Sequence, residues 1–417
     1  MRATKIRRRS RMFRRRHVGR TIAKVCAWLL VIPAVIGGYF LAKHLFTKTP
    51  VSRGEEDVPA VVTTTEPTAA PTRPEEPTPE KEPEDTALKD LRGFWLPGAL
   101  LSDVSRYEAT LTAATEAGYN TVVVDLKDAD GKLWYASATE LAEQARAVKE
   151  GALTVEELTA VAKTLKETYH LTLIPRLYAF RDNTAPRYLD TARVSVKGSP
   201  RTVWYDNDPS AGGRRWLNPY AADARRYIVE LAAELKAAGF SRILLDGVQF
   251  PNQESSAYYG DASVTAVPRE EVLAGFVSQL NEALGKNGWL LTATALAAVG
   301  EKTTAYGGNP VTYGAPAVAP WVMPGEMGGS LTVGEEKVKQ PAAHPYEAVS
   351  LLLSQLHSRL QLMENAPTAV PWLQAGGLSA EAVATEQKAL RETFGEGAPY
   401  LLYSAKGVYD FGPSDNV

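Results

Sequence analysis

Cysteine is almost absent from this chain of 417 residues, and histidine is scarce. The one cysteine is Cys26, so the chain has no pair of cysteines that could form a disulfide bond. The rest of the chain therefore has neither a cysteine nucleophile nor a cysteine-ligated metal site. The five histidines are scattered, and two of them, His17 and His44, flank an apolar segment. The sequence predicts a domain stabilised by burial alone, with no metal and no cofactor.

Acidic residues are absent from the first 48 residues, which hold 13 of the 46 lysines and arginines. The rest of the chain then carries 33 basic and 48 acidic residues, a net charge of −15. A basic block of this kind can bind nucleic acid. Here it precedes an uncharged stretch, residues 25–42, which as a helix would span about 27 Å, close to the thickness of a bilayer core. The pattern favours a membrane anchor over nucleic-acid binding.

The charge bias also predicts orientation, because positive residues flanking a span stay in the cytoplasm. We expect a basic cytoplasmic tail over 1–24 and a single transmembrane anchor in the cell membrane over 25–46. The domain that follows should lie on the extracellular side. A cleaved signal peptide is the alternative, but its apolar region is shorter, about 7–15 residues, and "YFLAKH" fits a cleavage site poorly. Residues 47–87 are rich in Pro, Glu and Thr, which predicts a disordered linker.

Beyond the linker, short apolar runs alternate with helical patterns. The runs are at 93–97, 121–127, 171–180, 242–250, 289–296, 315–324, 369–374 and 399–405. Eight such βα units predict an α/β fold, a (β/α)8 TIM barrel over 88–417. A doubly wound open sheet is the alternative, although no Gly-rich phosphate-binding motif follows the first strand. Residues 297–314 show no clear helical pattern, so the fifth helix should be short or missing.

Helices are expected over 102–117, 154–169, 218–239, 270–284, 346–360 and 380–394. Thr154 and Glu157 have the spacing of a capping box at the start of the second helix, as do Ser105 and Glu108 at the start of the first. Asn218 is expected to cap the third helix, with a proline directly after it.

Asp246 stands out in the stretch "SRILLDGVQFP", residues 241–251. A strand covered on both faces is usually a continuous apolar run, and aspartate is depleted in strands. Asp246 lies near the end of the fourth expected strand, and active sites of TIM barrels lie at the C-terminal ends of their strands. Asp246 is therefore a candidate catalytic residue. The alternative is a structural ion pair with Arg176.

Other polar side chains occupy equivalent positions, and we expect them to line the same site. These are Asp125, Asp128, Arg176, Tyr178, Gln249, Glu326, Gln374 and Tyr403. Some have structural alternatives: Asp125 could pair with Lys127 or Arg176, and Asp128 could be the acceptor of a turn in "DADG". The long segment 181–217 carries Trp204 and Trp216, which are expected to form a sugar-binding wall or lid.

The motifs "GYNTVVVDLKDADGKLWYAS", "LIPRLYAFRD", "WLNPYAADARRYIVELAAELKAAGFSRILLDGVQFP", "PWLQ" and "LLYSAKGVY" resemble a family of bacterial glycoside hydrolases. Its members are TIM-barrel proteins, long catalogued as a domain of unknown function and often membrane-anchored. The resemblance covers residues 93–411 and implies a carbohydrate substrate. The chain departs from the family pattern at Asn218, at Gln249 and at "MPGEMG", so a non-catalytic carbohydrate-binding barrel remains the alternative.

Glycosidases generally use two carboxyl groups. Asp246 is the first candidate, as nucleophile or charge stabiliser, and Arg176 would keep it ionised. Some sugar-cleaving barrels carry the second carboxyl group after strand six, where Glu326 lies, while Asp125 and Asp128 are its competitors. The fifth strand, "LLTATAL", offers no acid.

Overall fold

The computed structural model describes residues 88–412. The tail, anchor and linker expected over 1–87 lie outside this range. Among residues 88–412 no helix combines the length and apolar character that a membrane crossing requires.

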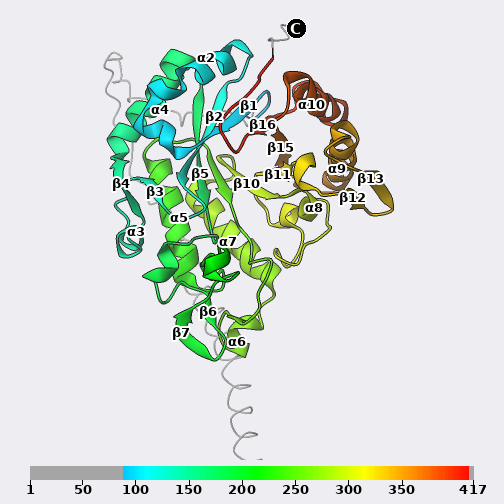
Figure 1. Ribbon diagram of the computed structural model, residues 1–417. Coiled ribbons are helices and arrows are strands. Elements are labelled where there is room, and N and C mark those ends of the chain that lie inside the picture. Colours follow the sequence, from blue (N-terminus) through cyan, green and yellow to red (C-terminus); the bar gives the residue numbers. More distant parts are fainter. Residues whose placement is uncertain (1–87, 413–417) are drawn as a thin grey trace, which may run out of the picture. The chain divides into compact units, whose positions relative to one another are not determined.

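Eight parallel strands form a closed barrel (Figure 1). They are β1 (Arg92–Leu96), β2 (Thr121–Lys127), β5 (Thr172–Tyr178), β8 (Ile243–Asp246), β10 (Trp289–Thr294), β11 (Ala317–Val322), β15 (Trp372–Gln374) and β16 (Tyr400–Tyr403). They follow one another around the barrel in chain order, and β1 closes it by pairing with both β16 and β2. All eight lie within the runs that the sequence indicated, apart from Arg92 at the start of β1. The TIM barrel is thus confirmed, and the open sheet is excluded.

Helices follow the strands and cover the outside of the barrel (Figure 1). They are α2 (Glu108–Glu116), α4 (Val155–Tyr169), α5 (Ala222–Ala237), α7 (Arg269–Leu284), α8 (Ala295–Ala298), α9 (Pro345–Leu360) and α10 (Ala380–Phe394). After β10 the chain forms only the four-residue α8 and a 3-10 turn, Pro310–Thr312. The expected reduction of the fifth helix is therefore confirmed.

Smaller elements decorate the loops. On one side lie β3 (Leu133–Tyr135), α3 (Glu140–Gln144) and β4 (Val148–Leu153), and β3 extends the sheet from β2. The strands β6 (Ser195–Val196), β7 (Ser199–Val203) and β9 (Ala257–Tyr258) form a separate small sheet, with α6 (Ala262–Thr265) after it. A hairpin, β12 (Ser330–Val333) and β13 (Glu336–Lys339), precedes α9, and β14 (Thr368–Ala369) precedes β15.

The core has two layers because side chains alternate along each strand. On β2, Val122 and Val124 pack in the cluster between the sheet and the helices, whereas Val123 packs in the barrel interior. Ile174, Leu244 and Leu290 share that interior. The same alternation carries the next inward-facing positions towards the C-terminal mouth, where polar side chains replace aliphatic ones.

The predicted helix starts have different outcomes. The capping box at α4 is confirmed, since Thr154 Oγ1 accepts from the Glu157 amide at 3.2 Å and Glu157 Oε2 accepts from the Thr154 amide at 2.8 Å. The box at Ser105 and Glu108 is wrong. Asp103 caps the 3-10 helix Val104–Tyr107 that leads into α2, because its carboxylate accepts from the Arg106 amide and also binds the Ser105 hydroxyl at 2.6 Å.

The cap predicted at Asn218 is also wrong. Helix α5 begins at Ala222, after Ala221. The Asn218 side chain closes the preceding turn instead, accepting from the Tyr220 amide at 3.0 Å and donating to the Tyr259 carbonyl at 2.9 Å.

Candidate active site

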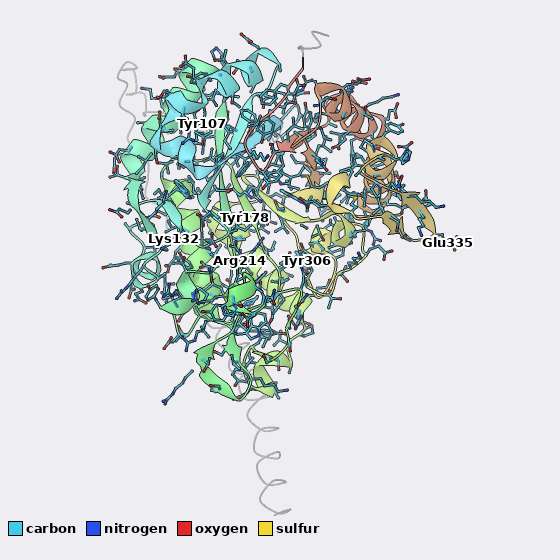
Figure 2. All side chains as sticks on the ribbon, in the orientation of Figure 1. Tyr107, Lys132, Tyr178, Arg214, Tyr306 and Glu335 are labelled. Atoms are coloured by element: carbon cyan, nitrogen blue, oxygen red, sulfur yellow. The ribbon has the colours of Figure 1, made fainter. Side chains whose placement is uncertain are left out.

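A cavity of about 460 Å³ opens at the C-terminal mouth of the barrel. Inward-facing side chains from several strands meet there, which is the geometry expected of this face of a TIM barrel. Six of the residues singled out from the sequence line it, namely Arg176, Tyr178, Asp246, Gln249, Glu326 and Tyr403. Figure 2 shows Tyr178 and Tyr306 near the centre of this region.

Arg176 is the buried centre of the site, with a side-chain exposure of 2%. Its Nε and Nη2 atoms donate to Asp246 Oδ2 at 3.1 and 2.5 Å, and Nη2 also donates to the Tyr178 hydroxyl at 2.6 Å. Its Nη1 atom lies 3.6 Å from Asp125 Oδ1. One guanidinium therefore contacts two carboxyl groups, and its positive charge offsets the negative charge of both carboxylates.

Asp246 and Asp125 lie at different depths. In the sheet Asp125 is opposite Arg176, whereas Asp246 is opposite Tyr178, two residues nearer the mouth. Asp246 lines the cavity, and its second oxygen accepts from the Gly247 amide. Asp125 lies beneath the cavity lining.

Burial gives Asp125 an unusual titration. It raises the pKa of this carboxyl group to about 6, although the charge of Arg176 acts in the opposite direction. Its buried Oδ1 has no hydrogen-bond partner among the described residues. Asp125 thus places a second carboxyl group against the Arg176 guanidinium, on the side away from the cavity.

Glu326 reaches the cavity from the other side of the mouth. It ends the 3-10 turn Pro324–Glu326 that follows β11, and its Oε2 accepts from the Trp321 indole nitrogen at 3.0 Å. The turn is held by Gln374, whose Oε1 accepts from the Gly325 amide at 2.7 Å. Gln374 thus contacts the turn that carries Glu326 and does not line the cavity.

Aromatic rings form one wall of the mouth. The Trp321 and Tyr403 ring centroids are 4.5 Å apart, and Tyr403 lies 5.1 Å from Trp95. The Arg176 guanidinium lies 5.7 Å from the Trp321 ring and 5.5 Å from Trp372. Such faces suit both cations and the apolar faces of sugar rings.

Besides Gln374, three predicted binding residues do not line the cavity, namely Asp128, Trp204 and Trp216. Asp128 is the acceptor of its own turn: Oδ1 binds the Asp130 and Lys132 amides at 3.0 and 2.9 Å, and Oδ2 binds the Trp134 indole at 3.1 Å. Asp128 was expected either to line the site or to be the acceptor of a turn in "DADG", and the structure shows the turn. Lys127 does not pair with Asp125 either, because its ammonium is buried against Asp182 at 2.7 Å.

Trp204 and Trp216 do not present the open sugar platform that the sequence suggested. Their exposed fractions are 2% and 5%, and both belong to the core between the sheet and the outer elements. The Trp204 indole donates to the Ser255 carbonyl at 2.8 Å and the Trp216 indole to Asp206 Oδ2 at 2.9 Å. Both polar and apolar parts of these side chains are therefore already used inside the protein.

Sequence analysis missed several residues of the cavity. Tyr306 donates to Gln249 Oε1 at 2.8 Å and accepts from the Thr294 amide at 3.0 Å. It comes from the irregular segment after β10, where no periodic pattern could place it. Arg181 and Asn252 also line the cavity from loops. Thr292 could have been found, since strand alternation on β10 points it inward.

The geometry can be compared with known proteins. A family model described as "Putative glycosyl hydrolase domain" matches residues 93–408. No curated protein matches the chain. Among solved structures, the PgaB (BpsB) glycoside hydrolase domain from Bordetella bronchiseptica is 14% identical with a TM-score of 0.53, covering 76% of this chain and 94% of that chain. This likeness shows the same fold.

Two further solved structures are less similar in shape. A hypothetical protein from Ruminiclostridium thermocellum ATCC 27405 is 25% identical with a TM-score of 0.41, covering 48% of this chain and 96% of that chain. The glycoside hydrolase domain of PelA from Pseudomonas aeruginosa is 16% identical with a TM-score of 0.36, covering 69% of this chain and 96% of that chain.

Proposed function

Since this chain belongs to the family of glycosyl hydrolase domains whose model matches residues 93–408, we propose that Asp246 and Glu326 together hydrolyse a glycosidic bond in a polysaccharide or cell-wall glycan. One observation carries the choice of residues. Asp246 and Glu326 are the two carboxylic side chains among the described residues that line the cavity at the C-terminal mouth. They project from the end of β8 and from the turn after β11, so a sugar in the cavity meets both.

The two carboxyl groups have different surroundings, which suits the two roles that glycoside hydrolysis requires. Asp246 is held in place by its ion pair with Arg176, and its carboxylate is positioned to act as a nucleophile or as a stabiliser of the positive charge that develops on the sugar. Glu326 is exposed and anchored to the Trp321 indole. As the general acid, Glu326 is placed to donate a proton to the leaving oxygen of a sugar bound against Trp321.

We also propose that the barrel works outside the cell membrane, tethered through residues 25–46. The support is the charge distribution of the sequence, with 13 basic residues and no acid in the first 48. A wall or surface glycan is then the substrate within reach.

The test incubates the full chain with a library of polysaccharides and wall glycans. Hydrolysis is measured as the release of reducing ends. Asp246→Asn and Glu326→Gln are nearly isosteric and should each lower turnover by about 100-fold or more. Glu335→Gln, at the exposed tip of the β12–β13 hairpin, is the matched control and should keep wild-type turnover. Melting temperatures of all variants show whether the fold is retained.

Asp125→Asn distinguishes the remaining candidate. If it abolishes turnover while Glu326→Gln does not, the second carboxyl group is Asp125. Wild-type turnover in folded Asp246→Asn would contradict the proposed chemistry. Binding of a glycan without any hydrolysis would instead identify a carbohydrate-binding barrel.

A further inference from the structure

The cavity that holds Asp246 and Glu326 does not end at their side chains. A second cavity of about 420 Å³ shares Thr294, Trp321 and Glu326 with it. A third, of about 400 Å³, shares Arg181 and Asn252 with it. The cavity with the two carboxyl groups is therefore the middle one of three that adjoin across the barrel mouth.

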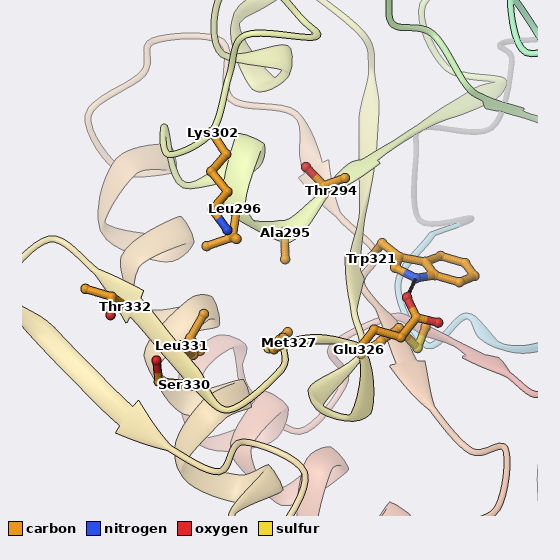
Figure 3. A pocket seen from close by; sticks show the side chains of 11 residues that line it. Thr294, Ala295, Leu296, Lys302, Trp321, Glu326, Met327, Ser330, Leu331 and Thr332 are labelled. Carbon is orange, nitrogen blue, oxygen red and sulfur yellow. Dashed lines mark hydrogen bonds between the residues drawn. The ribbon is translucent and has the colours of Figure 1, made fainter. Parts of the chain in front are cut away.

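The second cavity is lined by both apolar and polar side chains (Figure 3). Leu296 and Lys302, on and after α8, lie on one side of it, and Leu331 and Thr332 of strand β12 lie opposite. The hydrogen-bonded pair of Trp321 and Glu326 forms the boundary with the middle cavity. Lys302 is exposed and forms no ion pair with another residue in the range 88–412, so its ammonium is available to acceptor oxygens.

The third cavity is lined by polar side chains. Asp206 is fixed there, since its Oδ1 accepts from the Arg214 amide at 2.7 Å while its Oδ2 accepts from the Trp216 indole. Arg214 pairs with Asp130. Arg181 is half-buried at the boundary with the middle cavity, and its guanidinium has no hydrogen-bond or ion-pair partner within the described part of the chain.

We infer that the three cavities form one groove for an extended glycan chain, so that the bond facing Asp246 and Glu326 lies in the interior of that chain. A pocket that trims chain ends is closed on one side of the reacting carboxyl groups. Here the second and third cavities extend the site on both sides of Asp246 and Glu326. The apolar side chains of the second cavity, among them Leu296, Trp321 and Leu331, suit the faces of sugar rings. The free donors of Arg181 and Lys302 suit hydroxyl and carboxylate oxygens on either side.

The cleavage part of this inference rests on the proposed function, whereas the binding part does not. With the full chain, calorimetry should show that affinity for chito- and cello-oligosaccharides rises from the disaccharide to the octasaccharide. Thr332→Trp fills the second cavity and Gln253→Trp the third, because both residues are exposed lining residues. Each variant should weaken binding of the octasaccharide at least tenfold and leave disaccharide binding unchanged.

Glu335→Trp is the matched control, since it places the same ring at the hairpin tip outside the cavities (Figure 2). It should bind every length as the wild type does. Any polysaccharide that the full chain hydrolyses should yield oligosaccharides of mixed length early in the reaction. Affinity that stops rising at the disaccharide, release of single sugars alone, or no binding of any oligosaccharide would overturn the groove. Length-dependent binding without hydrolysis would overturn only the proposed function.

Discussion

Arg176 determines the electrostatics of the site at the scale of single residues. It is almost fully buried, and the two carboxyl groups that face it are Asp246 at the cavity surface and Asp125 below. Buried charges are tolerated when they are paired, and the removal of one partner leaves the others uncompensated. Arg176 therefore stabilises the fold and positions the Asp246 carboxylate at the cavity through the same contacts.

Replacement of Arg176 by methionine tests this dual role. The variant leaves two unpaired carboxylates in or near the barrel interior, so the free energy of unfolding at pH 7 should fall by about 3–5 kcal/mol. The pKa of Asp125 is already about 6 beside the guanidinium and should rise further without it, so the loss should shrink towards pH 4, where Asp125 is protonated. Urea unfolding of the variant and the wild type at pH 7 and pH 4 measures the loss in the free energy of unfolding.

Arg214→Met is the control, because its pair with Asp130 is far more exposed and should contribute about 1 kcal/mol or less. An equal loss of stability for Arg176→Met at pH 4 and pH 7 would indicate lost packing and not uncompensated charge.

Strand polarity and alternation explain which residues were predictable. They place Asp246, Arg176 and Tyr178 inward on neighbouring strands, and the structure brings these three together. Trp204 and Trp216 lie on a segment without regular periodicity. Their burial depends on contacts such as that between Trp204 and Ser255, 51 residues apart, which no local pattern indicates.

At the scale of elements, the eight strands were predictable because each is a short apolar run bounded by polar residues. The helix starts were less so. Asp103 precedes Ser105 by two residues, and a carboxylate accepts from the helix amides as well as a hydroxyl does, so the Ser-x-x-Glu spacing was misleading. Gln374 was predicted to line the site, but its side chain contacts Gly325 instead and joins β15 to a turn that the sequence does not define.

Helix α10 connects to the same strand through Glu386. This side chain is buried, and its Oε2 accepts from the Gln374 amide at 2.9 Å while Oε1 has no partner among the described residues. Burial raises its pKa to about 8, against the opposing effect of that hydrogen bond. The folded protein therefore keeps a proton here that the unfolded chain loses above its ordinary pKa of 4.5.

This retained proton makes stability depend on pH. Between about pH 5 and pH 8, Glu386 should lower the free energy of unfolding by about 1.4 kcal/mol for each pH unit of increase. Glu386→Gln keeps the acceptor for the Gln374 amide and removes the titration. Thermal unfolding should show the variant more stable than the wild type at pH 8, with the difference vanishing towards pH 5. Glu381→Gln, exposed on the same helix, should leave the pH dependence unchanged, and parallel curves for Glu386→Gln and the wild type would contradict this account.

At the scale of the whole molecule, charge is distributed very unevenly along the chain. The first 48 residues hold 13 basic and no acidic residues, whereas the remainder carries a net charge of −15. Basic residues beside a membrane span are retained in the cytoplasm. An acidic barrel on the other side would be joined to the span by residues 47–87, whose Pro, Glu and Thr content predicts an extended, protease-sensitive segment.

Protease added to intact cells that express the full chain tests this arrangement. We expect release of a soluble fragment that begins within residues 47–87 and keeps the barrel, because the eight closed strands pair their backbone groups with one another, whereas the composition of residues 47–87 predicts a segment open to protease. Mass spectrometry identifies the new N-terminus, and the melting temperature of the fragment should equal that of the barrel in the full chain. A cytoplasmic protein, intact in the same cells and cut after lysis, shows that the membrane was sealed. A barrel that is protected in intact cells and released only after lysis would place it in the cytoplasm and reverse the proposed orientation.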